Sequence, residues 1–231
     1  MKVVVNGDDL AYTKANTLGI VQAFKEGILR STTVLTNMPL VEWARSCVQD
    51  CSDLGLGVHL TLTLGNSLTQ NKTLTHADGT FLSRTECYAA KLDPNEVYAE
   101  WKAQIDRFIA VFGTMPTHLD SHHGVHDMNE CHLALAQDLA AEYGLELRRH
   151  NNRFAYVNGF GGQATAPKDL IALLEQYDGQ DIEIMCHPGY CDLALYRASS
   201  YSLDRVKELA ALCDSSVLDY VQTHGIELVH Y

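Results

Sequence analysis

The sequence predicts an α/β fold, a (β/α) barrel with seven strands and a distorted, TIM-like form. Short apolar runs of strand type alternate with amphipathic helical stretches, which is typical of a parallel sheet covered by helices. The length of 231 residues suits one α/β barrel domain, and no linker or repeat divides residues 1–231. Polar residues follow several of the predicted strands, as on the active-site face of a barrel. An open, doubly wound sheet is the alternative.

Two adjacent carboxylates follow the first predicted strand. The apolar run Val3–Val5 is typical of a buried parallel strand, and Asp8 and Asp9 come where that strand is expected to end. Side chains at successive extended positions point in opposite directions, so we expect the two aspartates to have different partners. The pair alone leaves a second interpretation open, because one aspartate could instead cap the next helix.

Helices and strands then alternate along the chain. Apolar residues at helical spacing, with Asp93-Pro94 as one start signal, predict the helices. These helices cover residues 14–28, 41–48, 93–113, 128–142, 170–177 and 203–222. Short apolar or alternating runs predict six further strands, at residues 32–36, 54–61, 117–120, 145–148, 182–186 and 226–229.

Two long segments, residues 63–90 and 150–165, have little periodicity and contain several Gly and Asn residues. A long irregular loop inside a compact domain is usually functional or disordered. We interpret residues 63–90 as a lid or substrate loop and expect both segments to set substrate specificity.

Composition restricts the partners. Acidic residues outnumber basic ones by 29 to 17, and the formal net charge of -12 argues against nucleic acid or an anionic membrane as a partner. The chain has no run of about 18 apolar residues and no signal-peptide pattern, so we expect no membrane partner and a cytoplasmic location. The seven cysteines form no C-x-x-C pair and are expected to be reduced thiols.

Residues suited to catalysis follow five of the predicted strands. The carboxyl ends of the strands of a β/α barrel converge on the face that carries the active site. The group expected at this face consists of Asp8, Asp9, His59, Asp120, His122, His123, Arg148 and His187.

One carboxylate and two imidazoles from separate strands could hold a divalent metal and leave positions for water and substrate. We select Asp9, His59 and His122 for this set. His122 and His123 are neighbours on an expected extended segment, so their side chains should face opposite ways and one of them should bind the metal. The alternative interpretation is that these histidines form ordinary hydrogen bonds at loop starts.

Other polar residues near this face are expected to support the site. Asp120 is expected to orient a histidine, and Arg148 to orient a carboxylate or contact substrate, with a structural ion pair as an equal alternative. His123 is expected to bind substrate or support a ligand. His126 either binds substrate or is solvated, and His118 is expected to lie outside the metal group.

Several segments resemble, in order, the YdjC/ChbG family of carbohydrate deacetylases, which act on acetylated chitooligosaccharides. These segments are VVVNGDDLA, STTVLTN, LGLGVHLTLT, PTHLDSHHGVH, LR and EIMCHPGY. The resemblance runs to about residue 190 and implies a β/α barrel with a divalent metal, commonly magnesium, held by Asp9, His59 and His122. Relatives often have a third successive histidine where this chain has Gly124, a difference that concerns a substrate contact more than the metal site.

The expected reaction is metal-assisted hydrolysis of an N-acetyl group on a small amino sugar, such as diacetylchitobiose or a short chitooligosaccharide. The metal, Mg²⁺ or Zn²⁺, would polarise the amide carbonyl and lower the pKa of a water molecule. Asp8 is the expected general base, and His187 the expected acid for the departing amine. The expected partners are the acetylated sugar and, as one option for assembly, a second copy of the chain in a homodimer.

Two other functions could use the same residues. A metal-dependent sugar isomerase or phosphoesterase is one, although a phosphate substrate predicts more basic residues or a glycine-rich cradle. A non-catalytic sugar-binding or metal-binding protein is the other, and it would have no need for Asp8 beside a complete ligand set.

Overall fold

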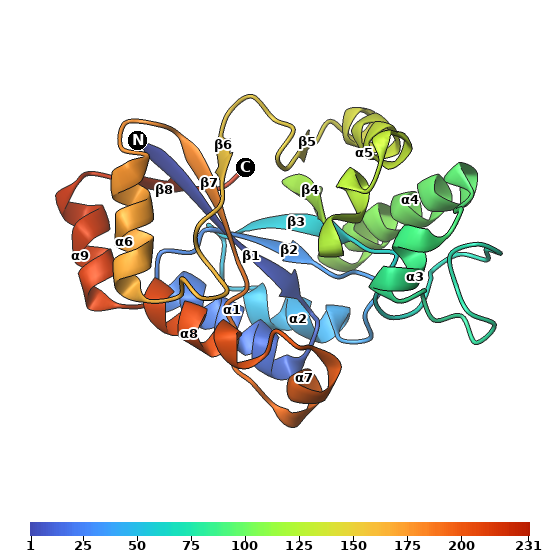
Figure 1. Cartoon of the computed structure of the whole chain (residues 1–231), viewed down its shortest axis with the longest axis horizontal. Helices are drawn as coiled ribbons and strands as arrows, with labels where there is room; N and C mark the ends of the chain where they lie inside the picture. The colour runs from blue at the N-terminus through green and yellow to red at the C-terminus, as the bar shows by residue number, and fades with distance from the viewer.

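A curled parallel sheet lies at the centre of the computed structural model, which describes residues 1–231 (Figure 1). The strand order is β5-β4-β3-β2-β1-β7-β6, and β8 pairs with β1 beside this path. The strands are β1 (Lys2–Leu10), β2 (Ser31–Val34), β3 (Gly55–Leu60), β4 (His118–Ser121), β5 (Glu146–Leu147), β6 (Ala155–Val157), β7 (Ile182–Cys186) and β8 (Glu227–Val229).

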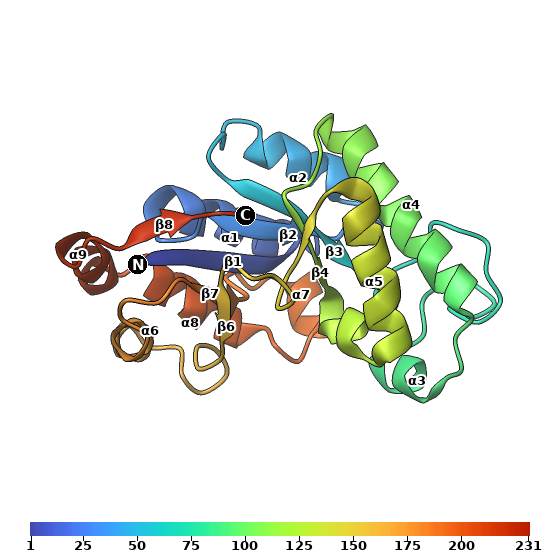
Figure 2. The same ribbon diagram turned by 90° about the horizontal axis from the view of Figure 1, so that it is seen from above.

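Helices cover the outside of the sheet, and α5, α4, α2, α1, α8, α6 and α9 are neighbours in this order (Figure 2). None of the helices combines the length and the apolar character needed to cross a membrane. The helices are α1 (Lys14–Glu26), α2 (Val41–Val48), α3 (Arg84–Ala89), α4 (Pro94–Phe112), α5 (Glu130–Tyr143), α6 (Pro167–Gln176), α7 (Leu193–Ala198), α8 (Leu203–Leu212) and α9 (Ser215–Thr223), with a 3₁₀ turn η1 (His122–Asp127).

The β/α barrel prediction is confirmed, although hydrogen bonds do not close the barrel. β5 and β6 are the two edges of the curled sheet and do not pair with each other. The sheet has eight strands where seven were predicted, because β6 lies in the segment 150–165 that was expected to be a loop. Likewise, α3 lies in the segment 63–90. Elements of three and six residues are too short for their periodicity to be recognised.

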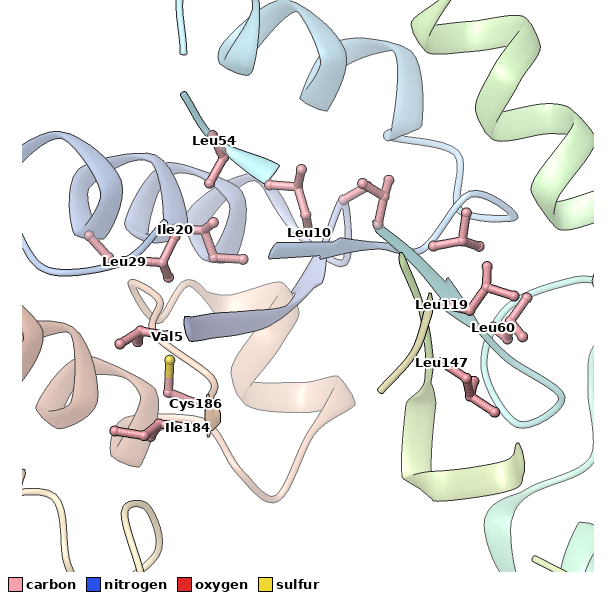
Figure 3. Close-up of a cluster of buried hydrophobic side chains, with 14 of the residues drawn as sticks. Val5, Leu10, Ile20, Leu29, Leu54, Leu60, Leu119, Leu147, Ile184 and Cys186 are labelled. Atoms are coloured by element: carbon pink, nitrogen blue, oxygen red, sulfur yellow. The ribbon is translucent and has the colours of Figure 1, made fainter. Parts of the chain in front are cut away.

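The core lies between the sheet and its helices. Strand β1 is buried on both faces beyond its first residue, as expected for a central parallel strand. Figure 3 shows Val5 of β1 in the same part of the view as Ile20, Leu29 and Ile184, with the leucines of β3, β4 and β5 gathered in the opposite part. These side chains belong to one connected cluster of 45 buried residues, so the strand ends that carry polar residues have a rigid base.

Candidate metal centre and active site

The two adjacent aspartates lie in a β-bulge within β1, whereas they were expected at the point where the strand ends. β1 continues to Leu10, and its register with β2 shifts between Gly7 and Leu10, so Asp8 and Asp9 together oppose one residue of β2. The backbone of Asp9 has φ of 75°, in the left-handed region that residues other than glycine rarely adopt. A bulge re-aims side chains, and here it gives the two carboxylates different partners.

Asp9 faces two histidines from other strand ends. Its Oδ1 atom lies 2.8 Å from Nδ1 of His122 and 3.3 Å from Nε2 of His59. Its Oδ2 atom accepts a hydrogen bond from Arg205 at 2.7 Å. Burial by itself would raise the pKa of Asp9, but His122 and Arg205 hold that pKa well below its usual value. Asp9 is therefore a buried, ionised carboxylate.

His59 links this group to a second set of carboxylates. Its Nδ1 atom lies 3.6 Å from Oδ2 of Asp120 and has no hydrogen-bond partner. Burial disfavours the charged ring, but Asp9, Asp8 and Asp120 raise the pKa of His59. The side chain thus has one nitrogen toward Asp9 and the other toward Asp120, which is the arrangement of a histidine ligand supported by a carboxylate.

Arg148 is completely buried and binds three carboxylates. Its NH1 nitrogen donates to Asp8 Oδ1 at 2.8 Å and to Asp120 Oδ2 at 2.7 Å, and its Nε donates to Glu183. Burial alone would lower the pKa of Arg148, but these three neighbours raise it well above its usual value. Of the roles expected for Arg148, substrate contact is wrong because the side chain is sealed from the cavity.

Asp8 has one oxygen in this ion network and one toward His187. Asn6 Nδ2 also donates to its Oδ1, at 2.8 Å. The Oδ2 atom lies 3.8 Å from Nε2 of His187, directly after β7. The backbone N–H of His187 donates to the buried carboxylate of Glu208. Hydrogen bonds therefore fix the Oδ1 atom of Asp8, while its Oδ2 atom faces His187 and is free of these bonds.

A cavity of about 700 Å³ opens at these strand ends. Thr63 and Arg84 from the segment 63–90 line one wall, as expected of a substrate loop, but no residue of 150–165 reaches the cavity. Residues 198–201, from the last residue of α7 into the loop before α8, form part of the wall instead. The candidate catalytic residues that line it are Asp8, Asp9, His59, His122, His123 and His187.

Three groups of side chains bring metal-ligand atoms within 4.8 Å of one another. In the group of Asp8, His59 and Asp120, Arg148 already donates to both carboxylates. A second group surrounds Asp127, which lies 3.3 Å from a guanidinium nitrogen of Arg149. The third group fits a divalent cation best, because it is buried, offers mixed nitrogen and oxygen donors and borders the cavity; it consists of Asp9, His59 and His122.

Residues 2–223 match the family model described as YdjC-like protein. The chain belongs to the YdjC-like family. A protein named carbohydrate deacetylase from Clostridium beijerinckii is 35% identical over 245 residues, which cover 100% of this chain and 99% of the relative. Another protein of that name, from Geobacillus stearothermophilus, is 35% identical over 99% of this chain and 96% of its own length.

Two solved structures share the fold of this chain. An Enterococcus faecalis protein, described as a candidate for cellobiose-phosphate cleavage, aligns with a TM-score of 0.92 and 32% identity over 100% of this chain and 97% of that chain. A family 4 carbohydrate esterase from Streptomyces lividans, in complex with acetate, aligns with a TM-score of 0.54 over 98% and 91% of the two chains. At 15% identity the esterase shows a shared fold alone.

In this YdjC-like chain, the expectation that His122 and His123 face opposite ways is wrong. They begin the turn η1, where His123 has φ of 57°, and their ring centroids are 3.9 Å apart. Their partners nevertheless differ, since Nδ1 of His123 lies 3.0 Å from Thr63 Oγ1. Burial and the neighbouring His122 lower the pKa of His123 to about 3, so its ring is neutral.

Two other histidines lie away from the cavity. His126 is fully buried with Nδ1 2.5 Å from Ser121 Oγ, so both substrate contact and solvation are wrong for it. His118 lies outside the group around Asp9, as expected. Its ring stacks on that of Tyr231, with the ring centroids 4.2 Å apart. A Cβ atom on Gly57 would come within 2.5 Å of the His118 ring, so this position of β3 requires glycine.

The YdjC-like site also contains residues that sequence reasoning missed. Arg205 and Glu208 of α8 reach Asp9 and His187, respectively, and Glu183 completes the ion network of Arg148. The only available signal was the presence of charged residues within apolar helical or strand patterns. That signal does not identify the partner of each charge, which for Arg205 lies 196 residues away in the sequence.

Proposed function

We propose that the protein is a metal-dependent carbohydrate deacetylase that hydrolyses the N-acetyl group of a small acetylated amino sugar. The observation that carries this proposal is the division of the aspartate pair. Asp9 faces two histidines, while Asp8 presents one oxygen toward His187 at the cavity. The full-length relatives named carbohydrate deacetylases support the substrate class.

Asp9, His59 and His122 would hold one divalent cation, Mg²⁺ or Zn²⁺. When bound, such a cation polarises an amide carbonyl and lowers the pKa of a water molecule. Arg205 occupies only the Oδ2 atom of Asp9, so Oδ1 is directed at both histidines. Asp120 lies behind His59 and would fix the orientation of its ring.

Asp8 would act as the general base. Arg148 and Asn6 both bind its Oδ1 atom, which fixes the carboxylate and leaves Oδ2 to accept a proton from water at the cavity. His187 is half-buried at the cavity wall and would give a proton to the departing amine, which is a poor leaving group without one.

The cavity size favours a small sugar. A volume of about 700 Å³ lies within the range of roughly 300–1,000 Å³ that is usual for small-molecule sites. We therefore propose diacetylchitobiose or a short chitooligosaccharide as the substrate. The cytoplasmic location and the homodimer stay predictions, to be checked by cell fractionation and by sedimentation.

Acetate release from diacetylchitobiose tests the proposal. We expect release that stops with a chelator and returns when Mg²⁺ or Zn²⁺ is added, because a cation held by Asp9, His59 and His122 would be needed to lower the pKa of the attacking water. The Asp8→Asn variant is the matched control for contaminating deacetylases. Absence of chelator-sensitive acetate release from every acetylated amino sugar tried would contradict the proposal and favour the isomerase, phosphoesterase or binding-protein alternatives.

A further inference from the structure

The left-handed backbone of Asp9 needs an explanation. A non-glycine residue in a sparsely populated conformation costs about 1–3 kcal/mol and persists only where its surroundings fix it. The backbone N–H of Tyr12 donates to the Asp9 carbonyl at 3.1 Å. With its amide oriented to satisfy both neighbours, Asn16 Nδ2 donates to the same carbonyl at 2.6 Å, and its Oδ1 accepts from Arg205 NH1 at 3.2 Å. The main chain of Asp9 is thus tied to α1.

The side chain of Asp9 is tied to α8 through Arg205. Arg205 is 2% exposed; its NH2 nitrogen donates to Asp9 Oδ2 at 2.7 Å, and its Nε donates to the carbonyl of Tyr201 at 2.8 Å. Together with the bond to Asn16, every guanidinium nitrogen has an acceptor within the protein. The guanidinium of Arg205 therefore has no nitrogen without a protein acceptor, although Arg205 borders the cavity.

We infer that Arg205, assisted by Asn16, is a positioning residue that presents Oδ1 of Asp9 to His59 and His122 for metal binding. The inference rests on the proposed function in one respect, the assignment of Asp9 as a metal ligand. Arg205 holds one carboxylate oxygen, so the other is the oxygen left for the cation.

Two possible roles of Arg205, electrostatic and positioning, predict opposite effects on metal affinity when its side chain is removed. A guanidinium beside a metal ligand repels the cation, so a purely electrostatic role predicts tighter metal binding when the charge is removed. A positioning role predicts weaker binding, because Asp9 then loses the contact that fixes its carboxylate. Lysine keeps the charge but cannot form the three bonds of the planar fork, so Arg205→Lys separates charge from geometry.

Titration of the metal-free protein with Co²⁺, followed by calorimetry and by visible absorption, tests this inference. We expect Arg205→Met to bind Co²⁺ about 10–100-fold more weakly, with an altered absorption spectrum that reports changed ligand geometry. Arg205→Lys should bind between wild type and Arg205→Met. Arg45→Met, at an exposed position of α2, is the matched control and should bind like wild type.

Wild-type or tighter Co²⁺ binding by Arg205→Met would overturn the inference. Asn16→Ala provides a second test if Arg205→Met does not fold, and it should weaken binding in the same direction by a smaller factor. Asp9→Asn distinguishes a failure of the proposed metal site from a failure of the positioning role of Arg205. If Asp9→Asn keeps wild-type affinity, the proposed metal site fails; if it loses the ion while Arg205→Met keeps it, only the positioning role fails.

Discussion

Two clusters of charged side chains meet at His59 and differ in what balances their charge. The cavity cluster consists of Asp9, His59 and His122, and it borders the cavity. The interior cluster consists of Arg148 with Asp8, Asp120 and Glu183, and its guanidinium is sealed within the barrel. Arg148 donates to all three carboxylates of the interior cluster, whereas Arg205 donates to Oδ2 of Asp9 and leaves Oδ1 facing the two histidines of the cavity cluster.

This difference shows how neighbouring aspartates acquire different roles. Buried ion pairs contribute little net stability, but they fix the geometry of the groups that they join. Asp8 is fixed by the interior cluster and reaches the cavity with one oxygen, while Asp9 turns through the bulge into the cavity cluster. The bulge therefore separates a candidate proton acceptor from a candidate metal ligand.

The largest effect is expected from Asp8→Asn. The variant should lose about 10²–10⁴-fold in deacetylation rate, because it removes the proposed general base while keeping the shape of the side chain. Steady-state acetate release at saturating metal measures this, with the exposed Asp106→Asn as a control. A rate close to that of the wild type would show that Asp8 is not the general base.

Arg148→Met tests whether the interior cluster depends on its single cation. Three carboxylates would stay buried without their partner, so we expect the free energy of unfolding to fall by about 3–5 kcal/mol. Urea denaturation measures the loss, and the exposed Arg153→Met should change stability by less than about 0.5 kcal/mol. Equal stabilities of the two variants would contradict the account.

Tyr231→Phe tests the outer edge of the interior cluster. The Tyr231 hydroxyl donates to Glu183, and a hydrogen bond to a charged group contributes about 1.5–3 kcal/mol. We expect the free energy of unfolding to fall by this amount in urea denaturation, with unchanged Co²⁺ affinity, because Tyr231 does not line the cavity that borders the proposed metal site. Weakened Co²⁺ binding would show that the two clusters are not separate.

The smallest effect is that of a change of one pH unit, and it concerns His118. Burial and nearby Arg148 lower the pKa of His118 to about 3, whereas an unfolded histidine titrates near 6.5. Below pH 6.5 the histidine of the unfolded chain therefore becomes protonated while native His118 stays neutral. The free energy of unfolding should then fall by about 1.4 kcal/mol per pH unit until the native ring also titrates.

The variant His118→Phe keeps a ring stacked on Tyr231 and removes the titrating group. Below pH 6.5 its free energy of unfolding should decline less steeply than that of the wild type. Parallel curves for the two proteins between pH 6.5 and 4.5 would contradict a neutral, buried His118.

Much of the strand-end group could be predicted because its placement follows from topology. The carboxyl ends of parallel strands meet on one face, so His59, His122 and His187 could be brought near the aspartates without knowing any side-chain contact. The bulge at Asp9 could not be predicted, because it depends on the register between β1 and β2. The partners of Arg148 and the contact of Arg205 depend on burial and on distant segments, which periodicity does not reveal.

The metal content of Asp8→Asn and Asp9→Asn after reconstitution tests whether the two adjacent aspartates have different roles. Both variants remove one carboxylate charge from adjacent positions in the same bulge, so charge and location are matched. We predict that Asp8→Asn keeps one ion per chain, as the wild type does, and that Asp9→Asn keeps none. Loss of the ion from Asp8→Asn, or its retention by Asp9→Asn, would contradict the division of roles within the pair.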